Sequence, residues 1–147
     1  MKVAVVGSRD MKIKNLHKYL PKETTEIVSG GAVGVDSCAA DYARQAGLKL
    51  TEILPEYEKY GKCAPLKRNL TIIDYADYVL VFWNGRSKGT KFVIENCVKR
   101  GKRYCVYKTK SKDVRMSFFI IIQAFPPPRA GTVFLYGVTA GGGFFYA

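Results

Sequence analysis

Five short runs of β-branched and aromatic residues, separated by segments with helical spacing, constrain the fold of this chain more than any other feature. The runs cover residues 2–6, 24–28, 49–54, 78–83 and 103–107. Short apolar runs of this kind are typical of strands buried on both faces, as in a parallel sheet. Apolar residues recur at helical spacing between them, in residues 12–20, 35–46, 65–73 and 93–98.

This alternation predicts an α/β fold with a doubly wound parallel sheet of about five strands and helices on both faces. Local signals agree with it. Gly47 follows the second helical segment as a terminator, and Pro65 suits the first turn of the third. The inner face of that third helix is expected to carry Leu66, Leu70 and Ile73. The loop before it is expected to run over residues 55–63.

Three glycine turns follow predicted strands, at residues 7–9, 29–34 and 85–90. In an open parallel sheet the ligand binds beyond the carboxyl ends of the strands. Glycine lets the backbone approach an anion, and the following helix offers unpaired N–H groups and the positive end of its dipole. The alternative is that these glycines only form tight turns. None of the turns has the pattern of an ATPase phosphate loop.

Charged side chains are placed to reach the same edge of the sheet. Arg9, Arg68 and Lys88 are the basic candidates, and Arg68 on the polar face of its helix can fork onto a phosphate. Asp36, on the first turn of the second helix, suits hydrogen bonds from a ribose diol. Simpler interpretations remain open, namely a solvated helix charge for Arg68 and a helix-dipole carboxylate for Asp36.

The charge balance favours an anionic partner. The chain of 147 residues has 24 basic and 12 acidic side chains, a net charge of +12. Residues 1–110 hold 21 of the basic and 11 of the acidic ones, a net of +10. Nucleotide, nucleic acid and acidic lipid all fit this excess, and charge alone does not choose among them.

The last quarter of the chain differs in composition, so we expect a domain at residues 1–110 and an atypical apolar, Pro- and Gly-rich tail at residues 111–147. The apolar run at 116–124 is shorter than the roughly 20 residues that span a bilayer. The N-terminus does not have the pattern of a signal peptide, so we expect a cytoplasmic protein without a membrane partner. The tail could add a helix or strand, mediate homo-oligomer formation, or be dispensable.

Metal chemistry is not predicted. The four cysteines, at positions 38, 63, 97 and 105, form no C-x-x-C pair, and His17 is the single histidine. A metal site, a disulfide and a Cys/His catalytic pair are therefore not expected, and no cofactor is identified apart from a nucleotide as ligand.

Several motifs in order resemble those of the SLOG superfamily, closest to its YspA/YpsA-related branch. They are VVGSRD (5–10), SGGAVGVD (29–36), YGK (60–62) with RN (68–69), and FWNGRSKGT (82–90). The resemblance covers residues 2–108 and implies a Rossmann-like site for nucleotides or nucleotide-derived ligands. The ligand-binding candidates are Gly7, Ser8, Arg9, Ser29, Gly30, Gly31, Gly34, Asp36, Tyr57, Arg68, Asn69, Trp83, Gly85, Ser87, Gly89 and Thr90.

The resemblance implies a nucleotide-binding site but no particular activity, because the superfamily includes phosphoribohydrolases, the DNA-processing protein A and sensor domains. The phosphoribohydrolases place a glutamate two residues after their Gly-Thr pair. Phe92 stands there in this chain, and the nearest glutamate is Glu95. Other departures are Val33 where the branch often has Arg, Tyr57 where it often has Trp, and Pro65-Leu66 where Gly-Pro is usual.

Three functions follow as hypotheses. The first is binding of a phosphorylated nucleoside or ADP-ribose-like ligand, with the base against Tyr57 or Trp83, as in a sensor or ligand-binding domain. The second is an N-glycosidase or phosphoribohydrolase in which Asp36 or Glu95 activates water. The third is binding of single-stranded nucleic acid, with stacking on tyrosines along a basic groove.

Overall fold

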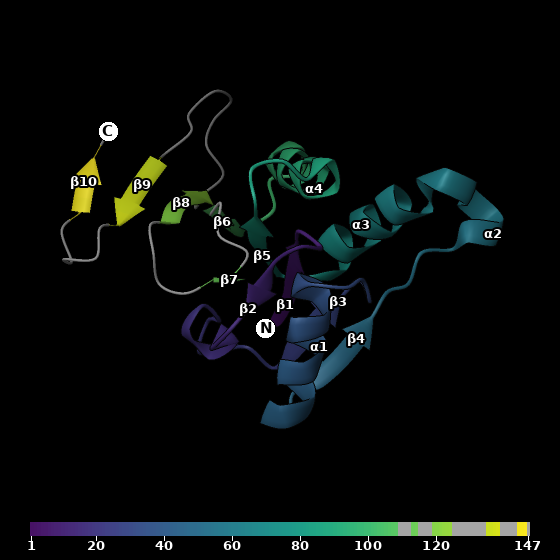
Figure 1. Ribbon diagram of the computed structural model, residues 1–147, viewed down its shortest axis with the longest axis horizontal. Helices are drawn as coiled ribbons and strands as arrows, with labels where there is room; N and C mark the ends of the chain where they lie inside the picture. Colours follow the sequence, from purple (N-terminus) through teal and green to yellow (C-terminus); the bar gives the residue numbers. More distant parts are fainter. Residues whose placement is uncertain (109–112, 115–118, 125–134, 139–143, 147) are drawn as a thin grey trace.

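The fold is a parallel sheet with helices on both faces, as the sequence predicts. The computed structural model describes residues 1–108, 113–114, 119–124, 135–138 and 144–146 (Figure 1). The parallel strands are β1 (Lys2–Gly7), β3 (Glu26–Ser29), β4 (Lys49–Glu52), β5 (Tyr78–Trp83) and β6 (Tyr104–Lys108). They lie side by side in the order β6-β5-β1-β3-β4. Strand order therefore reverses between β1 and β5.

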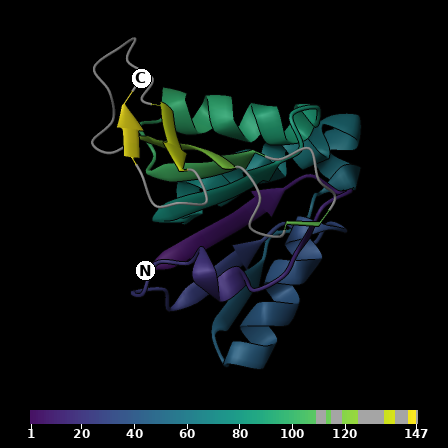
Figure 2. The ribbon, with the colours of Figure 1, turned by 60° about the vertical axis from the view of Figure 1, so that its left-hand side comes forward.

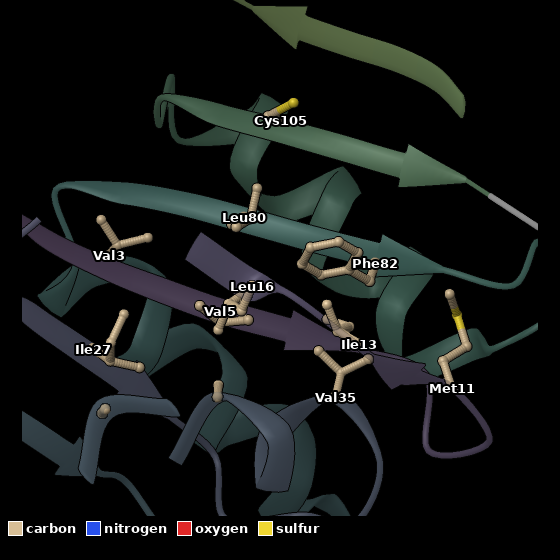
Figure 3. Packing of buried hydrophobic residues seen from close by; sticks show 12 residues of the cluster. Val3, Val5, Met11, Ile13, Leu16, Ile27, Val35, Leu80, Phe82 and Cys105 are labelled. Carbon is tan, nitrogen blue, oxygen red and sulfur yellow. The ribbon is translucent and has the colours of Figure 1, made fainter. Parts of the chain in front are cut away.

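Each face of the sheet has its own core. On one face α1 (Val35–Ala46) packs over β1, where Val5, Leu80 and Phe82 form part of a buried cluster (Figure 3). On the other face α3 (Ala64–Tyr75) and α4 (Lys88–Lys99) cover Ala4, Val79 and Val81. Figure 2 shows the sheet between α1 on one side and α4 on the other. Burial on both faces explains why the sequences of β1 and β5 are almost wholly apolar.

The predicted helix at residues 12–20 is wrong. This segment forms a two-residue strand, β2 (Lys12–Ile13), and a 3-10 helix, η1 (Leu16–Lys18). Asn15 between them has φ 60°, a left-handed conformation that interrupts any helix and that asparagine tolerates better than most residues. Ile13 and Leu16 are nevertheless buried beside α1. The spacing of the apolar residues in this segment therefore reflects which side chains are buried and does not indicate a helical backbone.

Two details around α3 also differ from expectation. The loop expected at 55–63 contains a short helix, α2 (Tyr57–Tyr60), and a 3-10 turn, η2 (Gly61–Cys63). Leu66 does not belong to the inner face of α3, since 39% of its surface is exposed, whereas Asn69 is buried. Pro65 does lie in the first turn of α3. The start of the helix therefore presents its apolar residues toward the carboxyl edge of the sheet.

The C-terminal segment adds strands to the sheet. β8 (Phe119–Ala124) pairs antiparallel with β6, and β9 (Leu135–Val138) and β10 (Phe144–Tyr146) follow it. β7 (Asp113–Val114) pairs in parallel with β2. Strands within the predicted tail thus extend the edge of the sheet at β6. Among the described residues, none of the helices combines the length and hydrophobicity that crossing a bilayer requires.

Candidate functional site

A cavity of about 400 Å³ opens at the carboxyl ends of β1 and β5, where the strand order reverses. This is the position at which open α/β sheets bind their ligands, and the volume suits a small molecule. Three turns and the starts of three helices contribute to its wall. The lining residues are Val6, Gly7, Arg9, Asp10, Ala32, Asp36, Pro65, Leu66, Arg68, Asn69, Asn84, Ser87, Gly89 and Thr90.

The structure brings some of the predicted residues together and leaves the others outside the lining. The predicted residues that line the cavity are Gly7, Arg9, Asp36, Arg68, Asn69, Ser87, Gly89 and Thr90. The predicted residues that do not line it are Ser8, Ser29, Gly30, Gly31, Gly34, Tyr57, Trp83, Gly85, Lys88 and Glu95. Most of the second group shape the turns around the cavity.

Asp36 is a buried carboxylate at the start of α1, with 4% of its surface exposed. Burial raises the pKa of Asp36 above its ordinary value, although the Arg68 guanidinium and backbone N–H groups of Ala32, Gly30 and Gly7 act in the opposite direction. The N–H of Ala32 lies 3.4 Å from Oδ2 of Asp36. Asp36 therefore ties the first two turns to α1 while it lines the cavity.

Arg68 places a half-buried guanidinium between two turns. Its Nη1 donates a hydrogen bond to the carbonyl of Gly30, and its Nε donates to Oδ1 of Asn69 at 3.2 Å. Burial lowers the pKa of Arg68, Asp36 raises it, and the neighbouring charge of Arg9 lowers it. An arginine remains protonated despite such shifts. The wall of the cavity therefore holds the guanidinium groups of Arg9 and Arg68 together with the carboxylates of Asp10 and Asp36.

The start of α4 is a feature that favours an anion. Ser87 caps this helix, and its Oγ accepts hydrogen bonds from the N–H of Thr90 at 3.3 Å and from Oγ1 of Thr90 at 3.0 Å. The twelve residues of α4 direct the positive end of the helix dipole toward the cavity. Gly89 and Thr90 line the cavity at this end.

Asn84 and Asp10 join the turn after β5 to the turn after β1, and the sequence prediction missed both as site residues. Nδ2 of Asn84 donates to Oδ1 of Asp10 at 2.8 Å, and the N–H of Asn84 donates to Oγ of Ser8 at 3.2 Å. Oδ1 of Asn84 accepts hydrogen bonds from the N–H groups of Arg86 and Ser87, each at 2.8 Å. An asparagine directly after a strand is a signal for such a turn.

The second glycine turn, at residues 29–34, is held by hydrogen bonds of Ser29 and by close packing at Gly34. Oγ of Ser29 donates to the carbonyl of Asp36 at 3.1 Å and accepts from the N–H of Gly31 at 3.2 Å. Gly34 has φ 83°, and a Cβ there would lie 2.4 Å from the carbonyl oxygen of Arg9. The backbones of the first two turns therefore touch, which only glycine permits.

Three of the predicted side chains do not line the cavity and have other surroundings. Nε1 of Trp83 donates to the carbonyl of Ser87 at 3.1 Å, and the ammonium of Lys108 lies 5.1 Å from the centre of its ring. Tyr57 on α2 is 57% exposed outside the cavity. Glu95 forms an exposed pair with Lys91 at 3.7 Å, one turn away along α4.

The fold defines a Rossmann-like α/β protein with a cavity at the reversal of strand order. Residues 1–56 match the family model for DNA recombination-mediator protein A, which confirms the SLOG-type resemblance over that part of the chain. The match includes the first two glycine turns and ends before the third. Neither the curated proteins nor the solved structures contain a significant match to the chain.

Proposed function

We propose that this protein binds a phosphorylated nucleoside or an ADP-ribose-like nucleotide in the cavity at the carboxyl edge of the sheet. The observation that carries the proposal is the convergence of Arg9, Arg68 and the start of α4 on one cavity. Because Arg68 offsets the charge of Asp36, the guanidinium of Arg9 and the helix N-terminus are the groups that favour a phosphate ester over a neutral ligand.

The polar groups suggest how such a ligand would lie. The phosphate is assigned to Arg9, Gly89 and Thr90, because the positive charge and the helix dipole act together there. The ribose is assigned to the centre of the cavity, above Gly7 and beside Asp36, whose carboxylate can accept from a hydroxyl group. Arg68 lies between these groups and neutralises the buried charge of Asp36.

Binding without hydrolysis is the function that the geometry supports best. Glu95 does not line the cavity, and Phe92 is absent from its wall as well. Asp36 is the carboxylate whose raised pKa suits a general acid or base, so N-glycosidic hydrolysis is the second candidate. Release of free base from AMP, lost in Asp36→Asn, would support hydrolysis.

The direct test is isothermal titration calorimetry with AMP, ADP-ribose and unphosphorylated adenosine. We expect micromolar affinity for the phosphorylated compounds and at least tenfold weaker binding of adenosine. The absence of binding by both phosphorylated compounds would refute the proposal.

Two arginines of neighbouring turns provide a matched pair of variants. Arg9 lines the cavity, whereas Arg86 is exposed and does not line it. Arg9→Gln is expected to weaken AMP binding about tenfold, because it removes a charge-assisted contact to the phosphate. Arg86→Gln changes the net charge equally and is expected to leave the affinity within about twofold. Equal losses in both variants would indicate a non-specific charge effect.

The cytoplasmic location, a homo-oligomeric state and binding of single-stranded nucleic acid stay predictions from the sequence.

A further inference from the structure

The cavity has two walls on opposite sides of β1, and the wall toward β3 is the one that carries the apolar side chains of Ala32, Pro65 and Leu66. Toward β5 the wall is polar and consists of Asn84, Ser87, Gly89 and Thr90. Toward β3 the wall carries an apolar strip beside the polar Asp36, Arg68 and Asn69. In this strip Ala32 comes from the turn after β3, and Pro65 and Leu66 come from the start of α3. Because β1 lies between β5 and β3 in the sheet, the two walls face each other across the end of β1.

The apolar strip continues into an exposed apolar rim. Most of the large apolar side chains that are exposed in the described part of the chain come from turns and helices at this edge of the sheet, namely Val33, Leu54, Tyr57, Tyr60 and Leu66. Leu54 packs directly against Gly31, where a Cβ would lie 2.4 Å from Cδ2 of Leu54. Clustered exposed apolar groups mark surfaces that are covered by a ligand or partner.

We propose that the apolar strip formed by Ala32, Pro65 and Leu66 binds the base of the nucleotide, and that Leu66 makes the site prefer nucleotides over bare sugar phosphates. This inference rests on the proposed function. With the phosphate at the polar wall and the ribose above β1, the base extends toward β3. There a flat ring loses water against Pro65 and Leu66, which is the favourable contribution of an apolar strip.

This placement differs from the contacts expected from the sequence. Trp83 is engaged with Ser87 and Lys108, and Tyr57 lies outside the cavity. Pro65 and Leu66 also occupy the positions at which the chain departs from the Gly-Pro pattern of the SLOG branch it resembles. A bulky leucine at this place changes the wall of the cavity without changing the phosphate end.

The test compares ribose 5-phosphate with AMP by isothermal titration calorimetry, because the two ligands share the sugar and phosphate and differ by the base. The proteins are the wild type, Leu66→Ala and the control Val98→Ala. Val98 is 55% exposed on α4 and does not line the cavity, so it matches Leu66 as a partly exposed apolar helix residue.

We expect the wild type to bind AMP at least about tenfold more tightly than ribose 5-phosphate. Leu66→Ala is expected to weaken AMP binding about fivefold and to leave ribose 5-phosphate within about twofold, since only the base loses apolar contact. Val98→Ala is expected to change neither. If ribose 5-phosphate binds but the preference for AMP is unchanged in Leu66→Ala, or both ligands weaken equally, the inference is overturned. If neither ligand binds the wild type, the inference is overturned, and the proposed function fails with it when ADP-ribose does not bind either.

Discussion

Gly89 allows the folding and the binding roles of the first turn of α4 to be separated. It lies in the cavity wall two residues after the cap residue Ser87, and a Cβ at this position would meet nothing within 4 Å. Gly89→Asp therefore places a carboxylate where the helix dipole favours one and where we assign the phosphate. The same charge is expected to help the helix and to oppose the ligand.

The magnitudes follow from these contacts. For folding, the loss of glycine flexibility and the favourable dipole together give about 0.5–1.5 kcal/mol of added stability. For binding, two unit charges about 5 Å apart at an effective dielectric constant near 20 repel by about 3 kcal/mol, which corresponds to a roughly hundredfold weaker affinity. Gly89→Ala adds a side chain without charge, so its affinity is expected to stay within about threefold of the wild type.

Urea unfolding followed by circular dichroism measures the first quantity, and calorimetric titration with AMP measures the second. The reasoning requires Gly89→Asp to be at least as stable as the wild type and to bind far more weakly than Gly89→Ala. If both variants bind AMP equally well, the phosphate does not lie at the start of α4.

Further predictions concern stability and the junction of the turns. Burial raises the pKa of Glu26, but hydrogen bonds from Thr51, Tyr75 and Lys49 outweigh it and hold the pKa below its ordinary value of 4.5. The stability that Glu26 contributes is therefore present above about pH 4.5 and is lost as the pH falls through the folded-state pKa, so Glu26→Gln should flatten the acid side of the pH–stability curve in urea titrations. Glu26→Ala should cost about 2–4 kcal/mol at pH 7 in the same assay, because the hydroxyls that donate at 2.7 and 2.8 Å lose their acceptor. Asn84→Ala should lower stability by about 1–3 kcal/mol in urea titrations and weaken AMP binding, and binding equal to wild type would show that this junction does not position the site.

The sequence was sufficient to predict the parallel sheet, because its central strands β1 and β5 are buried on both faces and form short apolar runs. It was insufficient for residues 12–20, where Ile13 and Leu16 have helical spacing but lie on either side of the left-handed Asn15. Spacing records which residues are buried, and here a strand and a 3-10 turn bury the same positions that a helix would. The backbone conformation of a single asparagine decided between them.

The sequence was also insufficient to predict which side chains line the candidate site. Helical spacing predicts that Leu66 is on the inner face of α3, yet the residue opens toward the cavity because α3 begins at the carboxyl edge of the sheet. The sequence also could not show that Trp83 would be held by Ser87, since that contact depends on the path of the turn between them. Residue type indicated which side chains suit an anionic ligand, and tertiary geometry decided which of them line the cavity.

The glycines that first suggest a phosphate site act largely through the protein itself. A Cβ at Gly7 would lie 2.5 Å from Cγ2 of Val35, and one at Gly30 would lie 2.6 Å from Nη1 of Arg68. Each glycine therefore lets a neighbouring element approach the turn, and the approach brings the start of α1 and the guanidinium of Arg68 to the end of β1. Anion binding and tight packing were alternatives for these residues in the sequence. In the structure packing forms the cavity, and Arg9, Arg68 and the start of α4 are the groups there through which we propose that an anion binds.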